Sequence, residues 1–145
     1  MTADAVHRQC GALPYRLTPM GVVEVLLVTS RGTGRWIIPK GWPIPGLSDP
    51  ESAAREAYEE AGVLGEIAET LLGTFTHWKS AEDGAEPGMF HIDLYPLRVE
   101  RELTLWPEAH QRRKVWVSIA QAVTMIEPGE LRDLVAAFDG RPPGA

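Results

Sequence analysis

The sequence predicts a single α/β domain in which helices pack on a mixed β-sheet. Short apolar runs typical of strands are mixed with three helical segments, without a regular βαβ alternation. The 145 residues fit one domain, and the 44% of apolar residues is enough for a hydrophobic core. No internal repeat or composition change divides the chain, so we expect one domain over residues 1–145.

Three strands are expected in the first third of the chain. The run Val22–Thr29, VVEVLLVT, is almost continuously apolar, which indicates burial on both faces of a sheet. A loop over Lys40–Leu47, KGWPIPGL, contains too much Gly and Pro for a helix or a strand. The expected strands cover 9–17, 22–29 and 36–39, after a loose arm over 1–7.

A helix is expected from about Pro50 to Ala61. Ser48 and Glu51 have the spacing of a capping box, and the alternative cap is Asp49 with proline at the first helical position. Gly62 supplies the C-terminal cap.

The second half of the chain is predicted to form strands followed by two short helices. We expect strands over 67–78, 89–99 and 115–118, loops over 79–88 and 100–113, and helices over 119–126 and 130–138.

Composition limits the classes of partner. The net charge of −6 argues against a general nucleic-acid binder, so an anionic ligand would need local Arg and Lys groups or a metal. The single cysteine, Cys10, is expected to be a small buried hydrophobe in a reducing compartment. The N-terminus lacks an apolar signal core, and no apolar run approaches membrane-spanning length. We therefore expect a soluble cytoplasmic protein.

Three carboxylates dominate one face of the predicted helix. Glu56, Glu59 and Glu60 stand at positions i, i+3 and i+4, which places them side by side. Like charges this close destabilise an isolated helix, and a divalent cation with oxygen ligands would offset the repulsion. The alternative is a solvated acidic face, which is what most charge runs are.

The stretch 41–63 resembles the Nudix box. That box reads Gly, five residues, Glu, seven residues, then Arg-Glu-hydrophobic-any-Glu-Glu-any-Gly-hydrophobic. One position differs, because Leu47 replaces the first glutamate, which in the family usually supports the box arginine or the metal-site architecture. Glu51 and Glu59 are available as substitutes. The positions in register are Gly41, Arg55, Glu56, Ala57, Glu59, Glu60, Gly62 and Val63.

The resemblance implies a fold and a reaction. The fold would be the Nudix α/β/α sandwich, a mixed sheet between helices, with a core over about 8–138. The reaction would be Mg²⁺- or Mn²⁺-dependent hydrolysis of a phosphoanhydride in a nucleoside diphosphate-X or another polyphosphorylated small molecule. Segments 35–39 and 112–117 look like the diphosphoinositol-polyphosphate and dinucleoside-polyphosphate hydrolase branch.

Other activities remain open within the family. One alternative is a nucleotide-sugar or damaged-nucleotide pyrophosphatase, and another is a ligand-sensing Nudix domain without turnover. Processing of 5′-triphosphate RNA is disfavoured by the negative charge. A homodimer is possible by family analogy. We expect substrate choice to depend on the loops over 79–88 and 100–113.

The resemblance also assigns roles within the box. Glu56, Glu59 and Glu60 would bind the metal, with the backbone carbonyl of Gly41 as a further ligand. One glutamate would also orient or deprotonate the attacking water. Glu59 is favoured, and Glu56 and Glu60 remain candidates because coupled carboxylates share their titration. Arg55 would orient the glutamates without touching the substrate.

Candidate substrate contacts are the cations around the box. Lys40 precedes Gly41, Arg35 begins the strand that leads to it, and Arg31 lies just before that strand. Each of these cations either clamps a phosphate or is an ordinary surface charge. The same two alternatives apply to the basic cluster 112–114. Trp42, in the loop beside Gly41, is the aromatic candidate.

Three further candidate residues lie outside the box. Glu108 would serve as an alternative base, because some family members use a carboxylate from another loop, but a solvated loop residue is the expected role. His77 and Trp78 end a strand, where packing in the core or at a pocket rim is expected.

Overall fold

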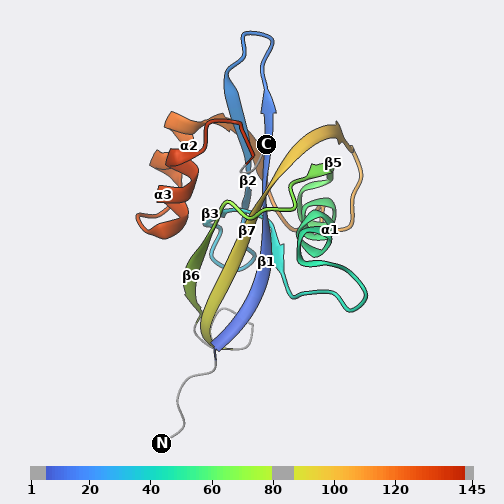
Figure 1. Cartoon of the computed structure of the whole chain (residues 1–145), viewed down its shortest axis with the longest axis vertical. Helices are drawn as coiled ribbons and strands as arrows, with labels where there is room; N and C mark the ends of the chain where they lie inside the picture. Colours follow the sequence, from blue (N-terminus) through green and yellow to red (C-terminus); the bar gives the residue numbers. More distant parts are fainter. Residues whose placement is uncertain (1–5, 80–86, 143–145) are drawn as a thin grey trace, which may run out of the picture.

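A mixed sheet forms the centre of the molecule, with helices on both of its faces (Figure 1). The computed structural model describes residues 6–79 and 87–142. Its strands are β1 (Val6–Leu17), β2 (Val23–Thr29), β3 (Trp36–Ile37), β4 (Lys40–Gly41), β5 (Val63–Ile67), β6 (Gly73–Lys79), β7 (Gly88–Glu102) and β8 (Lys114–Ser118). Its helices are α1 (Asp49–Ala61), α2 (Ile119–Met125) and α3 (Glu130–Ala137). Helix α1 lies on one face of the sheet, and α2 and α3 lie on the other, which confirms the α/β/α sandwich.

Strand β1 runs through the middle of the sheet. It pairs in parallel with β7 and antiparallel with β2, within the strand order β3-β2-β1-β7-β5. It also pairs antiparallel with β4, which places Cys10 opposite Gly41 and Gly11 opposite Lys40. This pairing anchors the start of the Nudix-like stretch to the centre of the sheet.

Two apolar clusters fill the layers on either side of the sheet. Val25 and Leu27 belong to the cluster beneath α2 and α3, whereas Leu26 and Val28 belong to the cluster beneath α1, and all four are fully buried. The alternation confirms that β2 is buried on both faces. Cys10 is also fully buried, in the cluster beneath α1.

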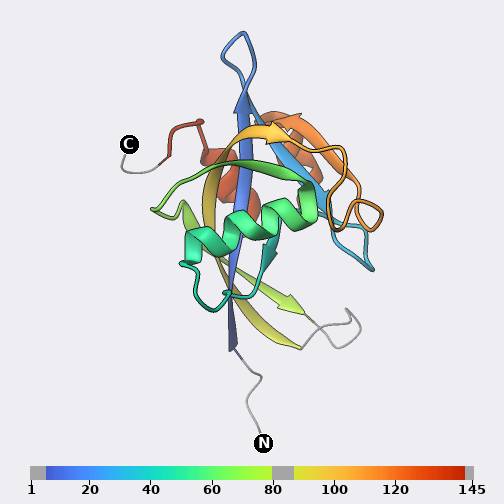
Figure 2. The same cartoon turned by 90° about the vertical axis from the view of Figure 1, so that its right-hand side faces the viewer.

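Helix α1 begins and ends where its local signals predict. The Ser48 hydroxyl accepts from the Glu51 amide at 3.2 Å, and the Glu51 carboxylate accepts from the Ser48 amide at 2.8 Å, so the capping box forms. Gly62 caps the other end with φ +68°, and its amide donates to the Tyr58 carbonyl at 3.0 Å. Because Ala53, Ala57 and Ala61 are the helix residues in the apolar cluster beneath α1, the helix lies close across the sheet (Figure 2).

The strand material predicted within 67–78 forms β6, which begins only at Gly73. A separate strand before it, β5, was not predicted, and both strands are antiparallel to β7. Strand β5 was missed because Gly65 weakens its pattern, and Gly65 marks a bulge where a Cβ would collide with the Arg98 carbonyl. The loop predicted over 79–88 falls mostly outside the described residues.

Other boundaries also differ from prediction, among them β1, which begins at Val6 inside the arm expected over 1–7. Lys40 and Gly41 were expected in a loop and instead form β4, because β1 supplies partners for their backbone groups. Strand β7 continues to Glu102, into the expected connection over 100–113, because β5 pairs with that extension. Within the residues described, no helix is long and apolar enough to span a membrane.

Replacing Gly62 with Ala should lower the free energy of unfolding by at least about 2 kcal/mol. The residue has a positive φ and lies against the Trp106 ring. A Cβ at position 62 would lie 2.6 Å from Trp106 Cδ2. Urea denaturation measures the loss. Gly34→Ala is the matched control, since Gly34 also has φ +68° but its Cβ would meet no atom within 4 Å. Equal losses in the two variants would contradict the predicted collision with Trp106.

Candidate active site

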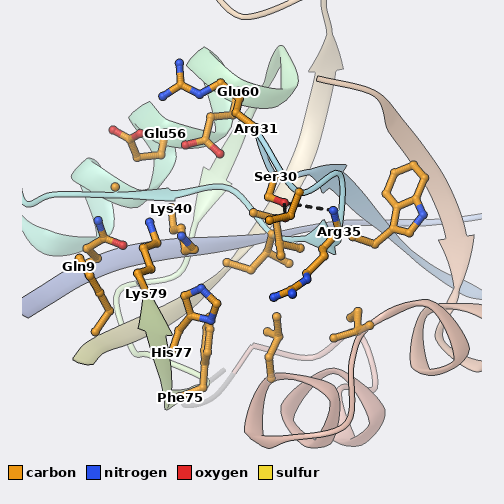
Figure 3. Close-up of a pocket in the computed structure, with 18 of the residues that line it drawn as sticks. Gln9, Ser30, Arg31, Arg35, Lys40, Glu56, Glu60, Phe75, His77 and Lys79 are labelled. Carbon is orange, nitrogen blue, oxygen red and sulfur yellow. Dashed lines mark hydrogen bonds between the residues drawn. The ribbon is translucent and has the colours of Figure 1, made fainter. Parts of the chain in front are cut away.

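The Nudix-like stretch forms one wall of a cavity of about 670 Å³ (Figure 3). The other walls come from β1, the β2–β3 connection, β6, β7, the connection after β7 and the turn between α2 and α3. Every predicted site residue except Arg55 lines it, namely Arg35, Lys40, Gly41, Trp42, Glu56, Glu59 and Glu60.

Glu56 lies directly against Gly41. A Cβ built on residue 41 would collide with all three terminal atoms of the Glu56 carboxyl group. The absence of a side chain therefore allows β4 and α1 to approach this closely. Burial raises the pKa of Glu56 to about 6, and the neighbouring Glu59 and Glu108 act in the same direction.

Glu60 is the most buried carboxylate of the site. Only 4% of the residue is exposed, and its Oε1 is buried without a hydrogen-bond partner among the described residues. Arg112 Nη2 lies 3.7 Å from that oxygen, which is an ion pair beyond hydrogen-bonding distance. Burial raises the pKa of Glu60 to about 8, and Arg112 partly opposes this rise.

A buried guanidinium joins the acidic residues to the sheet. Arg112 Nε donates to Glu108 Oε1 at 2.8 Å, and Nη1 donates to the Thr29 carbonyl at 3.1 Å. The side chain of Glu108 is only 18% exposed and lines the cavity. Glu108 is therefore not the solvated loop residue that was expected. The prediction failed because Arg112 and the Glu108 amide are themselves held by carbonyls distant in sequence, those of Thr29 and Glu59.

The three basic residues of the cluster 112–114 have separate environments. Arg112 alone faces the main cavity. Arg113 stacks over Trp36 with its Cζ 5.6 Å from the ring centroid. Lys114 pairs with Glu102 at 2.9 Å and donates to the Ala61 carbonyl at 2.8 Å. We therefore assign Arg113 and Lys114 to packing around the site.

The box arginine contacts a box glutamate. Arg55 Nε donates to Glu59 Oε1 at 3.1 Å across one helical turn, and both side chains are partly exposed. Leu47, at the position of the missing glutamate, is 41% exposed. Glu51 is engaged by the Ser48 amide, so of the two available substitutes Glu59 is the one that contacts Arg55.

The predicted substrate contacts occupy the cationic and aromatic parts of the cavity. Arg35 pairs with Glu127 at 3.3 Å, and Arg31 donates to Gln111 at 2.8 Å. Trp42 is 47% exposed, and its ring packs edge-on against Phe90 with centroids 5.5 Å apart. Lys40 points into the cavity from β4 (Figure 3).

Gln9 and Lys79 are among the cavity residues that the sequence analysis missed. Gln9 stands at the start of the first predicted strand, and Lys79 directly follows the strand predicted over 67–78. A cation just after an aromatic strand end was an available signal for Lys79. Nothing in the sequence marks Gln9, which reaches the cavity only through the pairing of β1 with β4.

The acidic residues suit a hard divalent cation in their chemistry. Carboxylate oxygens and a backbone carbonyl are the ligands that Mg²⁺ and Mn²⁺ prefer. The partnerless Oε1 of Glu60 and the Glu56 carboxylate beside Gly41 are oxygen donors at one place. Among residues 6–79 and 87–142, however, no three acidic, His or Cys side chains converge closely enough to hold an ion as they stand. The metal ligands therefore stay a prediction.

Comparison with known proteins decides the family. The model of the NUDIX domain matches residues 16–138. The chain belongs to the Nudix hydrolase family. Nudix hydrolases act on phosphoanhydride bonds, so the chain is a Nudix pyrophosphohydrolase.

Its relatives differ in length and name. Nudix hydrolase 21, chloroplastic, from Arabidopsis thaliana is 34% identical over 142 residues, which are 94% of this chain and 69% of the relative. Human diphosphoinositol polyphosphate phosphohydrolase 3-alpha is 35% identical over 107 residues, which are 72% of this chain and only 60% of the relative. The crystal structure of C. elegans Ap4A hydrolase superposes with a TM-score of 0.63 at 25% identity, covering 90% of this chain and 94% of that one.

Replacing Glu60 with Gln should stabilise the metal-free Nudix domain at alkaline pH. The folded-state pKa of Glu60 is raised to about 8, from an ordinary value of 4.5. The folded state therefore holds a proton that the unfolded state has lost, so Glu60 lowers stability progressively as pH rises from 4.5 to 8.

The measurement is urea denaturation of wild type and Glu60→Gln in EDTA across this pH range. The variant should be the more stable protein above pH 8, and the difference should vanish near pH 4. Glu66→Gln, on the exposed part of β5, is the control and should follow wild type. A Glu60→Gln variant that is less stable than wild type at pH 8 would contradict the assignment.

Proposed function

We propose that this Nudix protein is a divalent-metal-dependent enzyme that hydrolyses a phosphoanhydride in a polyphosphorylated small molecule. The observation that carries the proposal is the meeting of two charge sets in one cavity. Glu56 and Glu60 form its acidic wall, and Lys40, Arg35 and Arg31 face the same space. Acidic groups suit the metal, and basic groups suit the phosphate chain.

The residues of the site would have separate roles in the reaction. Glu56, Glu59, Glu60 and the Gly41 carbonyl would hold Mg²⁺ or Mn²⁺. When bound, the ion polarises a phosphoryl oxygen and lowers the pKa of a coordinated water. Arg55 would hold Glu59 in position through the contact it already makes.

A glutamate would remove the proton from the attacking water. Glu59 is our first candidate, and a third of its side chain is exposed. Glu56 and Glu60 remain candidates. Glu108 joins them because it lies in the cavity wall, although its carboxylate is held by Arg112.

Dinucleoside polyphosphates and diphosphoinositol polyphosphates are the substrates we favour. Support comes from the C. elegans relative, an Ap4A hydrolase, and from the human relative, a diphosphoinositol polyphosphate phosphohydrolase. The exposed Trp42 offers a surface for a nucleobase. Pyrophosphatases of nucleotide sugars or damaged nucleotides and a non-catalytic sensing domain are the alternatives.

We place the protein in the cytoplasm, without nucleic acid as substrate and with a homodimer as a possible assembly.

Replacing Glu59 or Glu60 with Gln should reduce turnover by about a hundredfold or more, because the neutral amide is a poor metal ligand. Phosphate release from dinucleoside, inositol and nucleotide substrates, with Mg²⁺ and then Mn²⁺, measures this. EDTA should abolish turnover, and Glu66→Gln is the charge-matched control. Tight nucleotide binding without turnover on any substrate would overturn the enzymatic proposal in favour of a sensing domain.

Replacing Gly41 with Ala should have a similar effect on turnover without unfolding the protein. The new methyl group would displace the Glu56 carboxyl group from its present position. We expect a loss of about a hundredfold in kcat and a melting curve with a single cooperative transition. Gly32→Ala, whose Cβ would meet no atom within 4 Å, is the control for a general effect of added methyl groups. Full activity in Gly41→Ala would show that the position of Glu56 does not matter.

A further inference from the structure

The C-terminal turn of helix α1 is bonded to one distant segment of the chain. An α-helix cannot bond its own last four carbonyl groups, and the last turn of α1 contains no basic residue to do so. All four carbonyls accept hydrogen bonds from residues 103–114, which pass beside the end of the helix (Figure 2). The bonds are Glu108 N to Glu59 O at 3.0 Å, Trp106 Nε1 to Glu60 O at 3.2 Å, Lys114 Nζ to Ala61 O at 2.8 Å and Leu103 N to Gly62 O at 2.8 Å. We refer to the donors Leu103, Trp106, Glu108 and Lys114 as the clamp.

Trp106 holds the helix end by more than its hydrogen bond. Its indole ring lies against Gly62, where a Cβ would approach the ring to 2.6 Å. The Lys114 ammonium lies 3.9 Å from the centroid of the same ring, within range of a cation–π interaction. Lys114 in turn bonds the Ala61 carbonyl and pairs with Glu102 of β7. Trp106 therefore joins the end of the helix to a lysine that is anchored on the sheet.

The clamp also fixes Glu108 relative to the helix. The amide of Glu108 bonds the Glu59 carbonyl, and its carboxylate accepts from Arg112 Nε in the cavity wall. Arg112 Nη2 then lies 3.7 Å from Glu60 Oε1. The segment thus contacts the same turn of α1 twice, once through backbone groups and once through charged side chains.

The turn that the clamp bonds carries two of the three box glutamates. Trp106 bonds the backbone of Glu60, whose carboxylate faces the cavity. Helix ends usually fray, and a carboxylate on a frayed turn would occupy many positions. A displacement of about 1 Å at a reacting group can lower a rate about a hundredfold. The clamp therefore restricts Glu59 and Glu60 at the point where a helix without it would be least ordered.

We propose that Trp106 is a positioning residue for the proposed hydrolysis. Its bond to the Glu60 carbonyl holds the turn that carries Glu59 and Glu60 in a fixed position, from which their carboxylates bind the metal ion. Trp106 lies outside the lining of the cavity, so it acts through the glutamates and touches neither metal nor substrate. This inference rests on the proposed function, because it takes both glutamates as metal ligands. It gives the connection between β7 and β8 a role in turnover, in addition to the substrate choice expected of that loop.

Trp106→Phe removes the hydrogen bond while an aromatic ring stays against Gly62. Electron paramagnetic resonance of free Mn²⁺ measures the dissociation constant of the metal, which should rise about tenfold in the variant through the lost hydrogen bond. With Mn²⁺ saturating, kcat on the best substrate of the wild type should fall about tenfold, and KM should change by less than about twofold. An unchanged Mn²⁺ affinity and an unchanged kcat would overturn the inference.

Trp116 offers a matched control. It is also a half-buried tryptophan whose Nε1 donates to a glutamate, at 3.1 Å to Glu102 Oε1, and Arg16 Cζ lies 4.1 Å from the centroid of its ring. Its acceptor is a side chain of β7, whereas Trp106 bonds a carbonyl of the helix. Trp116→Phe should therefore keep the wild-type Mn²⁺ affinity and kcat, even where it lowers the melting temperature. An equal fall in both variants would show that Trp106 serves stability alone.

Hydrogen exchange of the metal-free protein in EDTA is independent of turnover. In wild type the amides of Glu60, Ala61 and Gly62 should exchange as slowly as those of residues 53–57, because the clamp prevents fraying. In Trp106→Phe the first three should exchange about tenfold faster, and residues 53–57 should keep their rates. Unprotected last-turn amides in wild type would overturn the inference even if the variant does not fold.

The metal-binding and exchange measurements distinguish failure of the inference from failure of the proposed function. If wild type cleaves no substrate but Trp106→Phe weakens Mn²⁺ binding and loosens the last turn, the enzymatic proposal fails and Trp106 stands as a positioning residue of a metal site. If substrate is cleaved and neither Mn²⁺ affinity nor last-turn exchange changes in the variant, the proposed function stands and the role of Trp106 fails. Faster exchange along the whole helix with unchanged Mn²⁺ affinity would assign Trp106 to the fold alone and overturn the inference.

Discussion

The acidic centre of this protein depends on one buried guanidinium. Arg112 contacts Glu108 and Glu60 and donates to the Thr29 carbonyl, so it links the connection after β7, helix α1 and strand β2. Its side chain is 8% exposed, which means that little water competes for these contacts. Without it, Glu56, Glu60 and Glu108 would repel one another in a poorly hydrated space. The sequence position of Arg112, far from the helix it serves, makes the site a property of the whole fold.

The site is held in place by residues that take no part in the proposed reaction. The alanines of α1 let the helix lie close to the sheet, and the pairing of β4 with β1 brings Gly41 beneath Glu56. This arrangement favours function over stability, because burial raises the pKa of both Glu56 and Glu60. Such carboxylates lower the stability of the empty fold at neutral pH, and the cation of the proposed function would restore it on binding.

Local signals predicted those parts of the fold that depend on neighbours in sequence. The caps of α1 involve residues within one turn, and the box has fixed spacing, so both could be read directly from the chain. Strand β5 was missed because Gly65 and a bulge disrupt its pattern, and only its pairing with β7 defines it. The burial of Glu108 and the positions of Gln9 and Lys79 escaped prediction for the same reason. Their environments are made by segments that are distant in sequence.

The replacement of the first box glutamate by Leu47 is explained by the arginine it would have supported. Arg55 already has a partner in Glu59 at 3.1 Å and lies 5.4 Å from the centroid of the Tyr58 ring. Both charged side chains are partly exposed, so their ion pair is worth less than about 1 kcal/mol. A divalent cation that requires Glu59 therefore has only a weak interaction to displace. The same pair holds the Glu59 carboxylate while the site is empty, which is a positioning that a glutamate at position 47 would otherwise have to provide.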